Sequence, residues 1–199
     1  MQITDDDLIK KCQQGDTAAF EELVVLYEKR VYSIAYRMMG NHEDACDLAQ
    51  EAFIKIFRSI KNFRGESSFS TWLHHVVANV CRDFLRKNKL KVSSIDEPVQ
   101  YEGEALGKQL QDFSNTPEQE IEQKELQDYI QQLIKQLPED YRMVLVMREF
   151  MEFSYEEIAA ELNISLGTVK SRLSRARNML KNKLIIDREQ SVPITRQIR

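Results

Sequence analysis

The C-terminal part of the chain contains a stretch whose side chains could bind DNA. Residues 161–177 read ELNISLGTVKSRLSRAR, in which basic and hydroxyl side chains alternate with apolar ones and no acid follows Glu161. A guanidinium can bridge the O6 and N7 atoms of a guanine, while lysines and hydroxyls bind backbone phosphates. The chemistry that this stretch indicates is recognition of nucleic acid.

Two helices joined by a short turn would position these side chains. Ser154–Glu157 reads SYEE, a capping box that starts a helix, and Asn163 tolerates the left-handed conformation of a turn. Ser165 then caps a second helix, whose N-terminal half would enter the major groove, as in a helix-turn-helix. The candidates for contact on that helix are Thr168, Ser171, Arg172, Ser174 and Arg175 on its outward faces, with Lys170 and Arg177 flanking. The alternative is a structural helical hairpin whose basic face is only solvated.

Other residues that could do chemistry have spacings that do not suit it. His74 and His75 are adjacent, so on a helix they point about 100° apart and make a poor pair of metal ligands, even with Cys81 nearby. The acidic residues 5–7 would face different sides of a helix and suit a helix N-terminus better than catalysis. The three cysteines form no C-x-x-C pair and are expected to be reduced thiols. We therefore expect no catalytic residue, no metal, no cofactor and no enzymatic activity.

Charge divides the chain into blocks that its total conceals. The 199 residues have a formal net charge of −4, yet residues 55–91 hold nine basic and two acidic residues. Residues 93–129 hold two basic and ten acidic residues, and residues 166–184 hold six basic residues and no acid. One basic block is typical of a solvated helix face, but two blocks that coincide with helical motifs favour two nucleic-acid-binding segments.

Helical periodicity accounts for most of the chain, and no strand pattern is visible. Three long helices are predicted before residue 92, beginning after the caps Asp16, Asn41 and Ser70. A further helix is predicted after Thr116, with Pro117 in its first position and Gln119 closing a capping box, and another over about 139–151. The predicted fold class is all-α, with a helical bundle over 1–92, a flexible acidic linker over 93–115, a helix-turn-helix domain over 116–186 and a short tail over 187–199.

Residues 47–89 carry a specific resemblance. They read DLAQEAFIKIFRSIKNFRGESSFSTWLHHVVANVCRDFLRKNK, which resembles region 2 of a bacterial sigma factor, and the helix-turn-helix domain resembles region 4. With only these two regions and a short linker, residues 16–184 are similar to the extracytoplasmic-function (ECF) group of the sigma-70 family. The chain lacks the N-terminal acidic region and the region 3 of primary sigma factors, so a housekeeping role is not expected.

The resemblance implies roles for the first domain. In the family, the face that corresponds to Asp47, Gln50 and Glu51 docks on the clamp helices of core RNA polymerase. The loop 63–68 and the helix after it would trap a flipped base of the −10 element, with Asn79 at the base-reading position. Loops of aromatic and hydroxyl side chains suit this task, because stacking or capture returns about 1–3 kcal/mol per unstacked base. The residues expected at the −10 element are Phe63, Arg64, Gly65, Glu66, Ser67, Ser68, Asn79, Arg82, Arg86 and Lys87, with Lys89 beyond them. Trp72 is interpreted either as a core residue, which we favour, or as a base-contacting wedge.

The resemblance also implies partners and a place in the cell. It predicts core RNA polymerase, promoter DNA with −10 and −35 elements, and an anti-sigma factor, which in this family is often membrane-anchored. The acidic linker would thread the RNA channel of the polymerase. The chain has neither a signal peptide nor a run of about 18 apolar residues, so it is expected to be cytoplasmic and not itself a membrane protein. The function expected is initiation at a stress or envelope regulon; the alternative is a two-domain helix-turn-helix regulator that is not a polymerase subunit.

Overall fold

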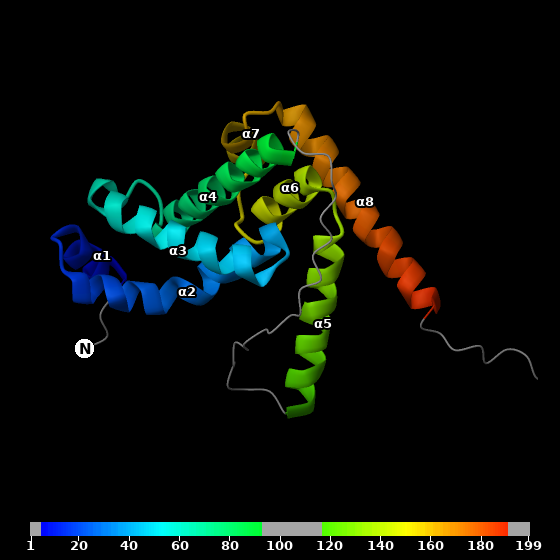
Figure 1. The fold of residues 1–199 in the computed structure, drawn as a ribbon, viewed down its shortest axis with the longest axis horizontal. Helices are drawn as coiled ribbons and strands as arrows, with labels where there is room; N and C mark the ends of the chain where they lie inside the picture. Colours follow the sequence, from blue (N-terminus) through cyan, green and yellow to red (C-terminus); the bar gives the residue numbers. More distant parts are fainter. Residues whose placement is uncertain (1–4, 93–116, 191–199) are drawn as a thin grey trace, which may run out of the picture. The chain divides into compact units, whose positions relative to one another are not determined.

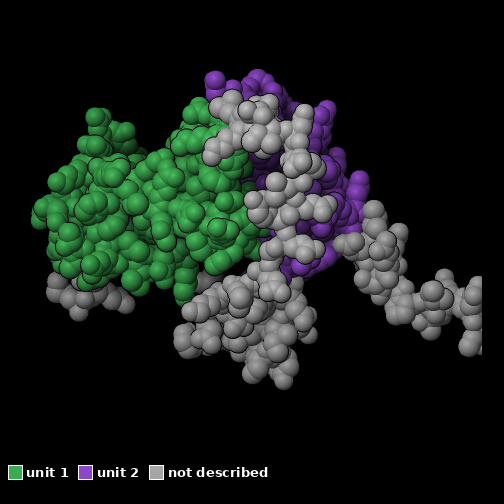
Figure 2. Space-filling view, viewed as in Figure 1, with its two compact units in different colours: residues 1–114 green, residues 115–199 purple. Residues whose placement is uncertain are grey.

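The computed structural model describes residues 5–92 and 117–190, with side chains for 5–88 and 126–185. Every regular element within those ranges is helical, so the predicted all-α fold class is confirmed (Figure 1). The chain divides into two compact units, unit 1 over Met1–Ser114 and unit 2 over Asn115–Arg199 (Figure 2). The predicted linker over 93–115 lies outside the described residues.

Unit 1 contains α1 (Asp5–Gln13), α2 (Thr17–Met39), α3 (His42–Ser59), the short 3₁₀ helix η1 (Ile60–Asn62) and α4 (Phe69–Val92). Figure 1 shows α2, α3 and α4 running alongside one another, and each packs on the other two. The core between them is fully buried, as at Val31, Ala52 and Leu73, which are 0% exposed.

The predicted caps of α2 and α3 are confirmed. The Asp16 side chain accepts hydrogen bonds from the Ala18 and Ala19 amides, at 3.0 and 3.1 Å, and Asn41 accepts one from the Asp44 amide at 2.8 Å. Gly40 ends α2 with φ of +80°, a left-handed conformation that favours glycine. Local sequence signals therefore place both ends of the α2–α3 turn.

The predicted cap of α4 was wrong by two residues. Ser68, not Ser70, accepts a hydrogen bond from the Thr71 amide, at 3.1 Å, and the helix begins at Phe69. The reason is burial: Phe69 is 6% exposed, and it reaches the core only from within the first helical turn, while Ser68 stays in solvent. Both serines could act as a cap locally, and packing of the phenylalanine selects the first.

Unit 2 contains α5 (Pro117–Lys135), α6 (Glu139–Glu149), α7 (Tyr155–Leu162) and α8 (Leu166–Gln190). Pro117 is the first residue of α5, as predicted, whereas the proposed capping residues Thr116 and Gln119 lie outside the described side chains. α6 packs on both α7 and α8, around a core that includes Val144, Ile158 and Val169, all 0% exposed.

The α7–α8 turn has the predicted helix-turn-helix features. Ser154 and Glu157 form the capping box, with the two reciprocal bonds at 3.1 and 2.7 Å. Asn163 adopts the left-handed conformation with φ of +53°, and Ser165 accepts a hydrogen bond from the Thr168 amide at 3.1 Å. α8 continues to Gln190, four residues beyond the predicted end of the domain at 186.

Candidate nucleic-acid interface

The exposed face of α3 carries the three residues expected to dock on polymerase. Asp47, Gln50 and Glu51 are all exposed, while Leu48 and Ala52 on the opposite side are buried. The Glu51 carboxylate forms an ion pair with Lys55 at 3.2 Å, one turn further along the helix. The stripe therefore presents carboxylate and amide groups together to solvent.

Two apolar side chains extend this α3 face, and the sequence interpretation missed them. Ile54 and Phe57 are 50% and 49% exposed, although both are large and apolar. On a helix, Ile54 lies seven residues from Asp47 and so directly in line with it. The Phe57 ring packs edge-on against Phe20 of α2, with ring centroids 4.9 Å apart. The signal that could have found them is this continuation of the polar stripe by apolar residues at helical spacing.

The loop before α4 is held at its base by aromatic packing. The Phe63 ring lies 5.6 Å from Phe69 and 5.3 Å from Trp72, and Phe69 lies 5.5 Å from Trp72. The side-chain amide of Gln13 donates to the Phe63 carbonyl at 2.7 Å, which ties α1 to the loop. Trp72 packs in this cluster and is partly exposed.

The tip of the same loop is open to solvent. Residues 64–68 are all exposed, and Gly65 has φ of +73°, with no atom near the position that a Cβ would occupy. The positive φ is the reason for a glycine here. The Arg64 guanidinium lies 3.8 Å from the Glu66 carboxylate, and the two side chains are 82% and 80% exposed. An ion pair this exposed contributes little to stability. The loop therefore presents charged and hydroxyl groups on an aromatic base.

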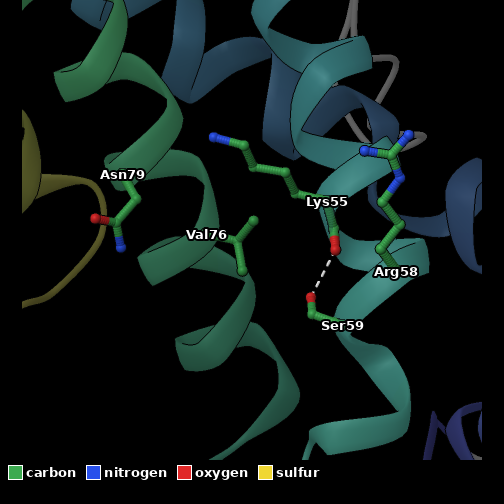
Figure 3. A pocket seen from close by; sticks show the side chains of 5 residues that line it. All are labelled: Lys55, Arg58, Ser59, Val76 and Asn79. Atoms are coloured by element: carbon green, nitrogen blue, oxygen red, sulfur yellow. Dashed lines mark hydrogen bonds between the residues drawn. The ribbon is translucent and has the colours of Figure 1, made fainter.

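Asn79 lies on α4 at the edge of a shallow hollow of about 320 Å³ between α4 and α3. Figure 3 shows the Lys55 side chain reaching from α3 toward α4, and Val76 pointing from α4 toward α3. The Asn79 amide donates to the His75 carbonyl at 2.9 Å and accepts a hydrogen bond from Arg82. Lys55 and Arg58 line the hollow as well and were missed among the candidates, although both belong to the basic block of 55–91.

The remaining basic candidates of α4 have an acidic neighbour on their own helix. The Asp83 carboxylate lies 3.8 Å from Arg82 and 3.6 Å from Arg86. Arg86 and Lys87 are exposed, and Arg82 is partly exposed. The side chain of Lys89 lies outside the described residues. The basic side chains of α4 are thus held by contacts within their own helix, between residues one to four positions apart.

In unit 2, the start of α8 presents most of its predicted candidates to solvent. Lys170, Ser171, Ser174, Arg175 and Arg177 are exposed, and Thr168 is partly exposed. The Thr168 hydroxyl lies 2.8 Å from that of Ser165, so its hydrogen bond belongs to the cap. The Arg175 guanidinium donates to the Tyr141 hydroxyl at 3.3 Å.

The prediction that Arg172 points outward was wrong. Its side chain is only 25% exposed and forms an ion pair with Asp140 of α6, with 2.8 Å between Nη2 and Oδ2. Position 172 borders the buried stripe of Val169 and Leu173, so the side chain lies at the α6–α8 boundary. Arg177 borders the stripe on its other side and pairs with Glu149 at 2.6 Å, a hydrogen bond that raises the pKa of the guanidinium.

The thiols and histidines of the described residues do not form a metal-binding cluster. No group of three or more His, Cys, Asp or Glu side chains that could hold a metal ion occurs among residues 5–92 and 117–190. Cys12 and Cys81 are buried, and burial raises the pKa of both thiols, that of Cys81 to about 12. Among the described helices, none has the length and apolar character needed to cross a membrane.

Comparison with known proteins assigns a class to each unit. Residues 23–91 match the family model of Sigma-70 region 2, and residues 127–180 match that of Sigma-70, region 4. The first match contains the α3 face, the loop and Asn79, and the second contains the whole α7–α8 turn. The two units are therefore the two regions expected of a small sigma factor.

Relatives along nearly the full length narrow this class. The chain is 39% identical over 184 residues to the ECF RNA polymerase sigma-E factor of Escherichia coli K12, covering 92% of this chain and 95% of that one. It is 38% identical to the sigma-E factor of Haemophilus influenzae, covering 92% and 96%. A solved sigma factor RpoE from Bartonella quintana, in complex with the anti-sigma factor NepR, is 26% identical, with a TM-score of 0.60 over 84% of this chain and 98% of that one.

The chain belongs to the ECF sigma factors of the sigma-70 family. Members of this family are transcription initiation factors and are not known as enzymes. The alternative of a helix-turn-helix regulator outside the polymerase gains no support, because both units match sigma regions.

Proposed function

We propose that unit 1 docks on core RNA polymerase and opens the −10 element, while unit 2 reads the −35 element. The observation that carries this proposal is the position of the two candidate sets. Both lie on exposed parts of a long helix and the turn before it, α4 with the loop 63–68 in one unit and α8 in the other. Each helix is backed by its own core, so each can present side chains with a fixed spacing.

The polymerase-binding surface is the α3 face. Asp47, Gln50 and Glu51 would supply polar contacts, and Ile54 and Phe57 would supply apolar area that is otherwise exposed to water. Burying such side chains in an interface is favourable by about 25 cal/mol per Å² of apolar surface. The combination suits a helical partner that offers both basic and apolar groups.

At the −10 element, the loop and the hollow would share the work. Unstacking a base costs a few kcal/mol, and one captured base returns about as much, so capture needs help from neighbouring contacts. The exposed loop tip and the partly exposed Trp72 can receive a base, with Asn79 reading its edge. Lys55 and Arg58 line the same hollow as Asn79, and Arg82, Arg86 and Lys87 follow Asn79 along α4. These basic side chains would bind backbone phosphates.

The acidic total charge fits a protein that does not bind DNA alone. With a net charge of −4 the free chain gains little from counterion release, which provides non-specific affinity. Polymerase would hold units 1 and 2 at a fixed separation, so that two weak contacts act together on one promoter. The chain would work in the cytoplasm, where the polymerase and the promoter are.

Regulation would come from an anti-sigma factor. The Bartonella quintana relative was solved in complex with one, which supports the same class of partner for this chain. We propose that this partner covers the α3 face and α8, is membrane-anchored, and releases the chain to a stress or envelope regulon. Release would then expose both surfaces at once.

Run-off transcription tests the proposal as a whole. The purified chain should direct initiation from a cognate promoter only with bacterial core polymerase, and strong promoter binding by the free chain at physiological salt would contradict it.

Asp47→Ala combined with Gln50→Ala should weaken core binding at least tenfold without changing the helical content. Glu21→Ala, which removes an exposed carboxylate from α2, is the matched control. Unchanged affinity in the double variant would reject the α3 assignment.

Base reading by Asn79 can be tested by combining the protein variant with abasic promoters. Asn79→Ala should slow promoter opening on the intact promoter but have no further effect when the base it reads is absent, because the two changes remove the same contact. A scan of abasic sites through the −10 element locates that base. Arg86→Ala is the control, since a phosphate contact should weaken opening on every template alike. Fully additive losses at every position would reject base reading by Asn79.

A further inference from the structure

The basic face of α8 is already in contact with side chains of its own unit. Arg172 pairs with Asp140 at 2.8 Å, and Arg177 pairs with Glu149 at 2.6 Å. Both acids belong to α6, and they lie 32 and 28 residues from their partners in the sequence. Residues 166–184 contain six basic residues and no acid, but in the fold α6 places a carboxylate against two of those six basic side chains.

The two pairs flank the buried stripe of α8, where it meets the exposed side that would face DNA in the proposed function. Val169, Leu173 and Ala176 pack inward, and Arg172 and Arg177 stand on either side of this buried stripe. Asp140 lies in the first turn of α6 and Glu149 is its last residue, so one carboxylate acts from each end of that helix. A phosphate that approaches either arginine therefore meets a carboxylate already bound to it.

Stability of the fold is a weak explanation for these pairs. Arg177 and Glu149 are 51% and 44% exposed, and ion pairs with such exposure contribute about 0–1 kcal/mol. In the other pair Asp140 is 48% exposed and Arg172 25% exposed, so that pair is more sheltered from water but still open on the acidic side. The two carboxylates should affect DNA binding more than they affect stability. An arginine that is paired with a carboxylate contributes less to neutralising DNA phosphates. The main consequence of the pairs thus falls on DNA affinity.

We propose that Asp140 and Glu149 are built-in competitors for DNA phosphates, which hold Arg172 and Arg177 and lower the non-specific DNA affinity of α8. The inference rests on the proposed binding of DNA by α8. Non-specific duplex DNA offers too few contacts to displace both carboxylates, whereas unit 2 held by polymerase on a promoter can. The pairs would therefore limit binding away from promoters without preventing binding at them.

The test is binding of a short mixed-sequence DNA duplex by the full chain across a range of salt concentrations, followed by fluorescence anisotropy. Asp140→Asn and Glu149→Gln should each raise affinity at low salt severalfold. Each should also steepen the plot of log affinity against log salt by about 0.9, the value for one added phosphate contact. The double variant should show the sum. Glu156→Gln is the matched control, since it removes an exposed α7 carboxylate that pairs with none of the described arginines.

The outcomes separate this inference from the proposed function. Lys170→Gln removes an exposed base of α8 and should weaken binding if α8 contacts DNA at all. If Lys170→Gln weakens binding but neither carboxylate variant strengthens it beyond Glu156→Gln, α8 binds DNA and the competitor role is overturned. A loss of affinity in Asp140→Asn would likewise overturn it, because the carboxylate would then be orienting Arg172. If Lys170→Gln and both carboxylate variants leave binding unchanged, the assignment of α8 fails and the inference fails with it. The Arg177–Glu149 pair keeps the test valid should Asp140→Asn fold poorly.

Discussion

Two helices in different units begin with the same local structure. Ser68 starts α4 and Ser165 starts α8, and in each case the serine Oγ accepts the amide of a threonine three residues later at 3.1 Å. The hydroxyls of serine and threonine are 2.8 Å apart at both sites. The two helices, 24 and 25 residues long, also carry the two candidate nucleic-acid surfaces.

What surrounds these matched helix starts differs. At α4 the residues next to the cap form an aromatic cluster, and Asp83, which pairs with Arg82 and Arg86, is on the same helix. At α8 the residues next to the cap, 163–169, include no aromatic side chain, and the acids that pair with its arginines come from α6. The same cap thus begins a surface suited to holding unstacked bases in one unit and a surface suited to duplex phosphates in the other. Local sequence starts the helix, and tertiary packing decides what it can bind.

The largest effect should come from removing the aromatic base of the α4 surface. Phe69→Ala deletes a 6% exposed ring that contacts Tyr27, Phe63 and Trp72, and should destabilise unit 1 by about 3–5 kcal/mol. Phe57→Ala also removes a phenylalanine ring, but one that is 49% exposed, so it should lower the free energy of unfolding by less than half as much. Urea unfolding followed by fluorescence of Trp72, the single tryptophan, measures both. Equal costs would show that the cluster does not hold the start of α4.

A smaller and matched effect is expected from the two caps. Ser68→Ala and Ser165→Ala should each cost about 1 kcal/mol of unfolding free energy, because each leaves one helix-end amide without its acceptor. Ser→Asn at either position should retain most of the stability. Thermal unfolding followed by circular dichroism compares the four variants. If only one of the two Ser→Ala variants lost stability, the two caps would have the same geometry but different effects on stability.

High pH should act on unit 1 through Tyr27. Burial, followed by the hydrogen bond to Asp5 at 2.8 Å, raises the pKa of Tyr27 to about 12 from its ordinary value of 10. Because the folded pKa is the higher one, the contribution of this phenol to stability is complete below pH 10 and is lost as the pH rises through 12. Tyr27→Phe should cost about 1 kcal/mol at neutral pH and flatten the decline in that window. An unchanged pH profile of Trp72-monitored unfolding would reject this role.

The smallest effect, none on stability, concerns the thiols, which all lie in unit 1. Cys46 is partly exposed with its sulfur 3.6 Å from His42, whereas Cys12 and Cys81 are buried with raised pKa values. The thiolate is the reactive form, so one thiol should react rapidly with a disulfide reagent in the native chain and two should react only through opening of unit 1. Cys46→Ser should abolish the fast phase. Rapid reaction of all three thiols would contradict the burial of Cys81.

The sequence by itself determined most of the fold, because its signals act over a few residues. Asp16, Asn41 and Ser154 cap helices where the pattern predicts, and Asn163 turns the chain as its tolerance of a positive φ allows. It also determined the order of the two sigma regions, through motifs that span residues 47–89 and 154–177.

Only the tertiary structure decided which of these side chains are available. It placed the α4 start at Phe69, since burial of that ring distinguishes Ser68 from Ser70. It left Ile54 exposed beside the predicted α3 residues, and it turned Arg172 from solvent toward Asp140. These outcomes depend on contacts between helices, and a run of letters shows neither which face a neighbouring helix covers nor which acids it brings with it.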